Sequence, residues 1–290
     1  MNKKSIGWSI FILFSFIFLI AFFYYNSTLL ISPSNIIIGS PPDALNAVEV
    51  SFNSKSGSKI KGWFINGVHE GVGIILLHGN NSNRRSMIER AKFLNYAGYS
   101  VLLFDFQAHG ESIGNYKTFG YLETLDVEAA INYLYSRYCI NKVGIIGVSL
   151  GGAASVLAYP KVKADAYVLE SVYSTIEDAV SNRLKIKLGF TCPIFTKFFI
   201  FLMQLRIEIN PKDLRPVDTI SKIKAPVLII AGTNDRRTTL DESKIFYSKA
   251  QNPKELWMIN KAAHIDFHQY KNIEYESRIL KFFSKYLLKY

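Results

Sequence analysis

The sequence has few cysteines and no cluster of basic residues, and both absences narrow the possible functions. Of 290 residues only two are cysteine, Cys139 and Cys192, and no Cys/His spacing typical of a zinc site occurs. The two thiols could pair in an oxidising compartment, but nothing in the sequence brings them together. The formal charge is +11, yet no Arg-rich helix or basic-aromatic run is present, so we expect no nucleic-acid partner.

The sequence also has no internal repeat and no low-complexity tract. Hydrophobic residues make up 49% of the chain and charged residues 20%, so a sizeable core can be buried and global disorder is not expected. The length fits one large α/β domain with appendages. The scattered basic excess is compatible with simple solubility or with attraction to an anionic membrane or substrate.

Charge is missing altogether from residues 5 to 42, and this stretch begins with a long apolar run, Ile6–Tyr25. A helix of about 20 apolar residues matches the thickness of a bilayer. Trp8 lies near one end of the run and Tyr24 and Tyr25 at the other, where aromatic rings suit the membrane interface. We therefore predict a transmembrane anchor over residues 1–25, followed by an irregular, proline-containing tether over residues 26–43.

The basic residues around the apolar run predict its orientation. Lys3 and Lys4 precede it, and no basic residue follows until Lys55. The positive-inside rule then places the N-terminus in the cytoplasm and the rest of the chain on the non-cytoplasmic side. A cleaved signal peptide is the competing interpretation. The run is longer than a usual signal-peptide core of about 7–15 residues, and no small-x-small site follows it closely, so we favour an uncleaved anchor.

Residues 44–290 alternate between short apolar runs and segments with helical spacing. The apolar runs are continuous, which is typical of a parallel sheet covered by helices on both faces. The predicted strands are Ala47–Phe52, Lys59–Ile65, Gly73–Leu77, Val101–Phe104, Val143–Ile146, Ala166–Leu169, Val227–Ile230 and Glu255–Ile259. The predicted helices are Arg84–Tyr96, Glu123–Tyr138, Leu150–Ala158, Leu240–Ala250 and Ile273–Leu288.

Residues 174–216 interrupt this alternation of predicted strands and helices. They contain the apolar run Ile194–Leu205, which is about half the length needed to cross a membrane. The run could be an ordinary buried helix. Alternatively, the insertion could form a cap over the functional site, with an apolar underside that contacts the substrate.

Polar residues follow five of the predicted strands, in the segments HGNN, DFQAHG, GVSLGG, ESVYS and GTND. In open α/β sheets, functional groups gather beyond the carboxyl ends of the strands. The segment GVSLGG fits the pattern G-x-S-x-G between a strand and a helix. A nucleophilic serine at such a turn needs a sparsely allowed backbone conformation, and glycines two residues to either side avoid clashes. We therefore predict Ser149 as a nucleophile.

A serine nucleophile needs a base, and the base needs an orienting carboxylate. His264 follows the last predicted strand, which places it at the same sheet edge; His109 is a serious competitor, and His268 looks like a surface residue. Asp235 directly follows a strand and is our predicted acid. Other carboxylates also follow strands, namely Asp105 and Glu170, and Asp235 could instead be a turn or N-cap residue.

Taken in order, HGNN, DFQAHGES, GVSLGG, AGTND and AAH resemble the α/β-hydrolase superfamily, over about Val48 to Leu288. The resemblance is greatest to the branch of serine aminopeptidases and lysophospholipase-like hydrolases, which includes members with one N-terminal membrane helix. It implies Ser149 as nucleophile, Asp235 as acid and His264 as base. It also implies an oxyanion hole from the backbone N–H groups of Asn80 and Leu150, and no metal or organic cofactor.

The sequence departs from the pattern of that branch in two places. RRTTL stands where a Val-Pro commonly follows the acid, which puts the local geometry in doubt, and AAH stands where GAGH is common. Neither departure removes a catalytic group. The expected function is a membrane-anchored serine hydrolase of ester-type bonds, acting on a small or lipid-like acyl substrate. An aminopeptidase-like amide hydrolase, with Glu170 or Glu177 binding the amine, and a non-catalytic binding protein are the alternatives.

Overall fold

An eight-stranded sheet forms the centre of the molecule in the computed structural model, which describes residues 3–190 and 193–288. Its strand order is β10-β9-β8-β7-β4-β5-β3-β2. The strands are β2 (Val48–Asn53), β3 (Lys59–Ile65), β4 (Val72–Leu77), β5 (Ser100–Phe104), β7 (Lys142–Val148), β8 (Ala166–Glu170), β9 (Val227–Gly232) and β10 (Lys254–Ile259).

The sheet is mostly parallel, as the continuous apolar runs predict. Neighbouring strands from β10 through β5 run parallel, whereas β2 and β3 form an antiparallel hairpin that pairs antiparallel with β5 at one edge. The turn-rich segment between β2 and β3 explains the hairpin, because the Ser54 N–H donates to the Ser58 carbonyl and closes a short loop. The six parallel strands bring their carboxyl ends to one edge of the sheet.

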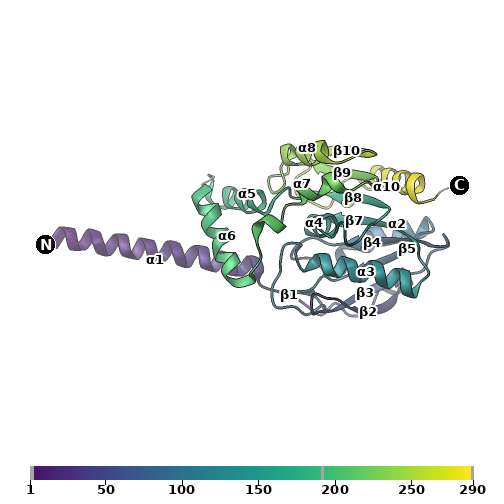
Figure 1. The fold of residues 1–290 in the computed structure, drawn as a ribbon, viewed down its shortest axis with the longest axis horizontal. Helices are drawn as coiled ribbons and strands as arrows, with labels where there is room; N and C mark the ends of the chain where they lie inside the picture. The colour runs from purple at the N-terminus through teal and green to yellow at the C-terminus, as the bar shows by residue number, and fades with distance from the viewer. Residues whose placement is uncertain (1–2, 191–192, 289–290) are drawn as a thin grey trace.

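Helices cover both faces of the sheet. Along β4, Ile75 and Leu77 belong to the core on one face, while Ile74 and Leu76 belong to the core on the other. The first face is covered by α3, α4 and α8, and the second by α2 and α10 (Figure 1). These helices are α2 (Ile88–Tyr96), α3 (Glu123–Arg137), α4 (Leu150–Leu157), α8 (Leu240–Lys249) and α10 (Asn272–Leu287). Helices on both faces confirm the predicted fold class.

The inserted segment between β8 and β9, called the cap below, is helical and lies next to the carboxyl edge of the sheet (Figure 1). It contains α5 (Ile176–Leu188), α6 (Pro193–Ile207) and the short α7 (Pro216–Thr219). The apolar run noted in the sequence lies within α6, and Phe199, Ile200 and Met203 are its buried side chains. Cys192 of this insertion lies outside the described residues, and Cys139 is exposed just after α3.

The N-terminal helix α1 (Lys3–Ile31) projects far from the sheet, and only its C-terminal part meets the rest of the molecule (Figure 1). Residues 6–31 are long and apolar enough to cross a membrane. Most large side chains of the projecting part are exposed; Phe18, for example, is 72% exposed. Phe23 by contrast is 1% exposed and packs on α6, with ring centroids 5.2 Å from Phe195 and 5.6 Å from Phe198.

The predicted boundary between anchor and tether needs correction, because α1 continues beyond residue 25 to Ile31. Polar side chains that favour loops here bond back to the preceding turn of the helix: Asn26 to the Phe22 carbonyl and Ser27 to the Tyr24 carbonyl. The cap also holds this turn, since the Lys187 ammonium donates to Asn26 Oδ1 at 2.7 Å.

The remainder of the predicted tether, after Ile31, is bound to the domain. β1 (Ser34–Asn35) pairs in parallel with β6 (His109–Gly110) in a separate two-stranded sheet. Farther along, the Glu111 carboxylate accepts the N–H groups of Ile38 and Gly39, both at 2.9 Å. These contacts fix the position at which the chain leaves α1.

We predict that Phe23→Ala loosens the contact between α1 and α6. Removing a buried aromatic ring costs about 3–5 kcal/mol, so local opening should become at least about a hundredfold more frequent. Hydrogen–deuterium exchange of the α6 amides, measured on the full chain in lipid nanodiscs, would report this opening. Phe18→Ala is the matched control, since that ring is exposed. Equal exchange in the two variants would show that the docking does not depend on Phe23.

Candidate active site

Ser149 lies on a tight turn between β7 and α4, in a backbone conformation that side chains rarely adopt. Its φ is +50° and its ψ is −109°, outside the regions that L-residues favour. Such a conformation costs about 1–3 kcal/mol and persists only where the surroundings impose it. It is the geometry expected for a serine that must project from a strand-to-helix turn.

Two glycines make this turn sterically allowed. A Cβ on Gly147 would lie 2.5 Å from the Cα of Gly152, and one on Gly151 would lie 2.5 Å from the carbonyl oxygen of Leu77. Both obstacles are backbone atoms, which cannot move aside as a flexible side chain could. The spacing of glycines around the serine is therefore required by close approach of α4 to β7 and β4.

The predicted acid and base lie in contact. His264 Nδ1 is 2.7 Å from Asp235 Oδ2, and Asp235 is completely buried while the imidazole is partly exposed. The carboxylate also accepts from the hydroxyls of Thr238 (2.7 Å) and Ser171 (3.0 Å) and from the Arg237 backbone N–H (2.8 Å). Burial by itself opposes ionisation, but the hydrogen bond and charge of His264 and the Thr238 donors outweigh it and lower the pKa of Asp235.

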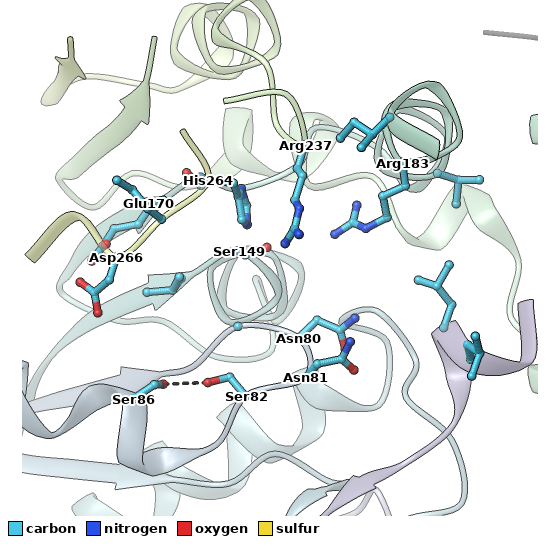
Figure 2. Close-up of a pocket in the computed structure, with 18 of the residues that line it drawn as sticks. Asn80, Asn81, Ser82, Ser86, Ser149, Glu170, Arg183, Arg237, His264 and Asp266 are labelled. Carbon is cyan, nitrogen blue, oxygen red and sulfur yellow. Dashed lines mark hydrogen bonds between the residues drawn. The ribbon is translucent and has the colours of Figure 1, made fainter. Parts of the chain in front are cut away.

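The ionised Asp235 carboxylate accepts a hydrogen bond from Nδ1 of His264 and thereby fixes the tautomer of the ring. The imidazole then carries its hydrogen on Nδ1, which leaves Nε2 free to take a proton. In Figure 2 the ring of His264 lies close to Ser149, and both residues line one cavity of about 530 Å³. Among the described residues no hydrogen bond joins the hydroxyl to the ring, and such contacts are often long before substrate binds.

Of the two residues expected to hold an oxyanion, Asn80 lines this cavity, and Asn80 and Leu150 both line a smaller cavity that also reaches Ser149. The N–H groups of Asn80 and Leu150 have no hydrogen-bond acceptor within the described part of the chain. Leu150 is the first residue of α4, so its N–H points out of the helix N-terminus. The loop after β4 approaches the serine closely, since a Cβ on Gly79 would lie 3.7 Å from that of Ser149.

His78 holds the loop that carries Asn80. Its Nε2 accepts the Phe106 N–H at 3.1 Å, so its Nδ1 is the donor to the Gly79 carbonyl at 2.8 Å. Burial, followed by the charge of nearby His109, lowers the pKa of His78 to about 3. The ring therefore stays neutral and keeps both bonds, so His78 shapes the turn that carries Asn80.

The competing acids occupy other, buried ion pairs. Asp105 binds Arg84 through both its backbone N–H and its guanidinium. Glu170 binds Arg90, with Nη2 to Oε2 at 2.9 Å, and also accepts from the Tyr275 hydroxyl. Neither carboxylate is bonded to a histidine, so these two groups act structurally, bracing the loops after their strands.

The competing bases are also engaged elsewhere. His109 is buried, with Nδ1 donating to the Gln107 carbonyl and Nε2 3.4 Å from Asn80 Oδ1. The expectation that His268 is a surface residue is wrong. It is buried and lies 2.8 Å from a carboxylate oxygen of Glu276, because α10 packs over the short helix α9 (Phe267–Tyr270) that carries it.

Sequence reasoning missed two features of the cavity. First, α1 forms part of its wall through Phe22, Leu29 and Leu30, facing apolar residues of α5 and α6. The apolar run gave no signal that the last turns of its helix would line a cavity of the domain. Second, two basic side chains, Arg183 of α5 and Arg237 of the loop after β9, reach into the cavity beside Ser149 (Figure 2). Arg237 belongs to the segment RRTTL, whose departure from the family pattern was its only sequence signal.

Comparison with known proteins agrees with this architecture. The family model described as "Serine aminopeptidase, S33" matches residues 71–200. The structure superimposes on the esterase Pf2001 of Pyrococcus furiosus with a TM-score of 0.74 and 26% identity, covering 89% of this chain and 98% of that one.

The chain is a member of the α/β-hydrolase superfamily. Among sequence relatives, the uncharacterised protein YfhR of Escherichia coli K12 is 27% identical, covering 85% of this α/β hydrolase and 80% of YfhR. The uncharacterised protein YqkD of Bacillus subtilis is 24% identical, covering 73% and 70% respectively. These matches establish an esterase-like hydrolase fold and leave the substrate open.

Proposed function

We propose that this α/β hydrolase is a membrane-anchored serine hydrolase that cleaves ester-type acyl bonds. One observation carries the proposal: the strained Ser149 turn faces a cavity that His264, hydrogen-bonded to Asp235, also lines. The two departures from the family pattern, RRTTL and AAH, leave the hydrogen bond between Asp235 and His264 in place. The esterase activity named for the Pyrococcus furiosus relative supports the ester class.

The chemistry follows from the positions of these groups. His264 Nε2 takes the proton of the Ser149 hydroxyl as the oxygen attacks the carbonyl carbon, and Asp235 stabilises the imidazolium that forms. The N–H groups of Asn80 and Leu150 receive the oxyanion of the tetrahedral intermediate. His264 then protonates the departing alkoxide, and a water molecule releases the acyl group by the same steps in reverse order. The mechanism needs no metal or organic cofactor.

We expect Ser149→Ala to abolish labelling by a fluorophosphonate probe and to lower kcat by at least about a thousandfold, with the protein still folded. Ser86→Ala is the matched control, because Ser86 lines the same cavity but donates to the Asn83 carbonyl. Mass spectrometry of the labelled peptide identifies the modified residue. Labelling at a residue other than Ser149, or none in the unaltered protein, would reject the mechanism.

The cavity favours an ester over an aminoacyl amide. An aminopeptidase would need an anionic group for the substrate amine, yet Glu170 is bound to Arg90, and Glu177 is 3.9 Å from Arg215. The free charge facing the cavity is instead positive, from Arg183 and Arg237. Together with the apolar wall from α1, α5 and α6, this supports an amphipathic, lipid-like acyl ester as substrate.

We therefore predict that kcat/KM rises with the length of the acyl chain, by about fourfold for each added methylene until the cavity is filled, because each buried CH₂ contributes about 0.8 kcal/mol. A series of acyl esters from acetyl to dodecanoyl, run beside aminoacyl amides, would measure this. A preference for the amides would support the aminopeptidase alternative and contradict the lipid assignment.

We also propose that α1 spans a membrane, with the N-terminus in the cytoplasm and the hydrolase domain on the other side. The basis is the apolar length of residues 6–31 and the position of Lys3 and Lys4 before it. Cys139 is exposed on the domain and reports the orientation when Cys192 is replaced by serine. A membrane-impermeant maleimide should label Cys139 in right-side-out vesicles. Labelling only after the vesicles are opened would show that the domain lies on the cytoplasmic side and would contradict the proposed orientation.

A further inference from the structure

Two guanidinium groups face the same part of the cavity without a carboxylate between them. Arg183 and Arg237 come from different elements, the cap helix α5 and the loop after β9, and both side chains extend toward the space beside Ser149 (Figure 2). Arg183 donates to the Ala179 carbonyl at 2.8 Å, and within the described residues the Arg237 guanidinium has no hydrogen-bond or ion-pair partner.

Among the described residues, the two buried arginines are neutralised, whereas Arg183 is half-buried and Arg237 is exposed. Arg84 pairs with Asp105 and Glu111, and Arg90 pairs with Glu170 and Asp266. The carboxylates whose charges reach Arg183 are already bonded elsewhere. Asp235 holds His264, and Glu242 accepts from Asn182 at 2.6 Å. Arg183 and Arg237 differ from Arg84 and Arg90 in having no carboxylate partner within the described residues, so their guanidinium groups are available to an anionic ligand.

The two cations also repel each other. Burial and, next, the charge of Arg237 lower the pKa of Arg183, but an arginine stays protonated in proteins, so both groups keep their positive charge. The backbone of Arg237 is held beside the site, because its N–H donates to Asp235 Oδ1. An anion bound between the guanidinium groups would relieve the repulsion and accept hydrogen bonds from both planar forks.

We propose that Arg183 and Arg237 form an anion subsite beside Ser149, which binds a phosphate or carboxylate substituent on the acyl ester that the enzyme hydrolyses. That the anion belongs to a substrate rests on the proposed function, whereas the subsite itself does not. The apolar wall from α1 and the cap then takes the acyl chain, and the two arginines select esters that carry negative charge close to the scissile bond.

The subsite is tested by binding, so that the result does not depend on turnover. The full chain carrying Ser149→Ala, in phosphatidylcholine nanodiscs, is titrated calorimetrically with dodecyl phosphate, dodecanoate and dodecanol, which share one apolar chain. We expect an anionic compound to bind about tenfold more tightly than dodecanol. A preference for dodecyl phosphate would assign the subsite to phosphate, and a preference for dodecanoate would assign it to carboxylate. Equal affinity for all three would overturn the proposal.

Variants identify the residues responsible. Arg237→Gln or Arg183→Gln, each added to Ser149→Ala, should reduce the ratio of affinities for the anionic compound and dodecanol by about tenfold. Each change removes charge-assisted hydrogen bonds. Arg237→Lys keeps the charge without the planar fork, so its preference for the anion should lie between those of the unaltered Arg237 and Arg237→Gln. Arg137→Gln removes an exposed positive charge at the end of α3 and controls for net charge. If Arg137→Gln weakened anion binding as much as Arg237→Gln, the preference would reflect overall charge, and the subsite would be rejected.

The kinetic counterpart uses the enzyme with Ser149 intact. The ratio of kcat/KM for 1-oleoylglycerol 3-phosphate over 1-oleoylglycerol, measured as oleate released, should fall about tenfold in Arg237→Gln. A chain that binds the anions as predicted but releases no oleate would contradict the proposed hydrolysis and leave the subsite standing. Turnover of both esters with an unchanged ratio in Arg237→Gln would contradict the substrate role of the subsite.

Discussion

The backbone turn at Ser149 is the constraint on which the rest of the site depends. Its conformation is unfavourable by itself, and the sheet holds it because α4 packs directly against β7 and β4, with only hydrogen atoms at Gly147 and Gly151 separating the backbones. The same packing leaves the N–H of Leu150, at the N-terminus of α4, directly beside Ser149. One local strain thus places both the predicted nucleophile and one of the predicted oxyanion donors.

Much of this arrangement could be predicted from the sequence, because parallel strands follow simple rules. Continuous apolar runs indicated the sheet, and polar residues just after Leu77, Val148 and Gly232 indicated which edge carries the chemistry. The contact between Asp235 and His264 followed from the same rule, since β9 and β10 are neighbours and end together. The strand-to-helix pattern around Ser149 was specific enough to define its turn.

What the sequence did not reveal depends on contacts between segments distant in the chain. The polar residues after Tyr25 look like a loop, and only their bonds to the preceding turn and to Lys187 of the cap keep them helical. His268 looks exposed beside other polar residues, and only the packing of α10 buries it. The proximity of Arg183 and Arg237 likewise arises from the fold of the cap over the sheet, which local patterns do not encode.

The C-terminal turns of α1 have a consequence for how this protein is handled. Because Leu29 and Leu30 line the same chamber as Ser149, the apolar N-terminal helix is also a structural component of the hydrolase domain. Trimming the first thirty or so residues to obtain a water-soluble preparation would open one side of that chamber to solvent. Selectivity measured on such a shortened polypeptide would describe a different, wider chamber from the one that the native protein presents to its substrate.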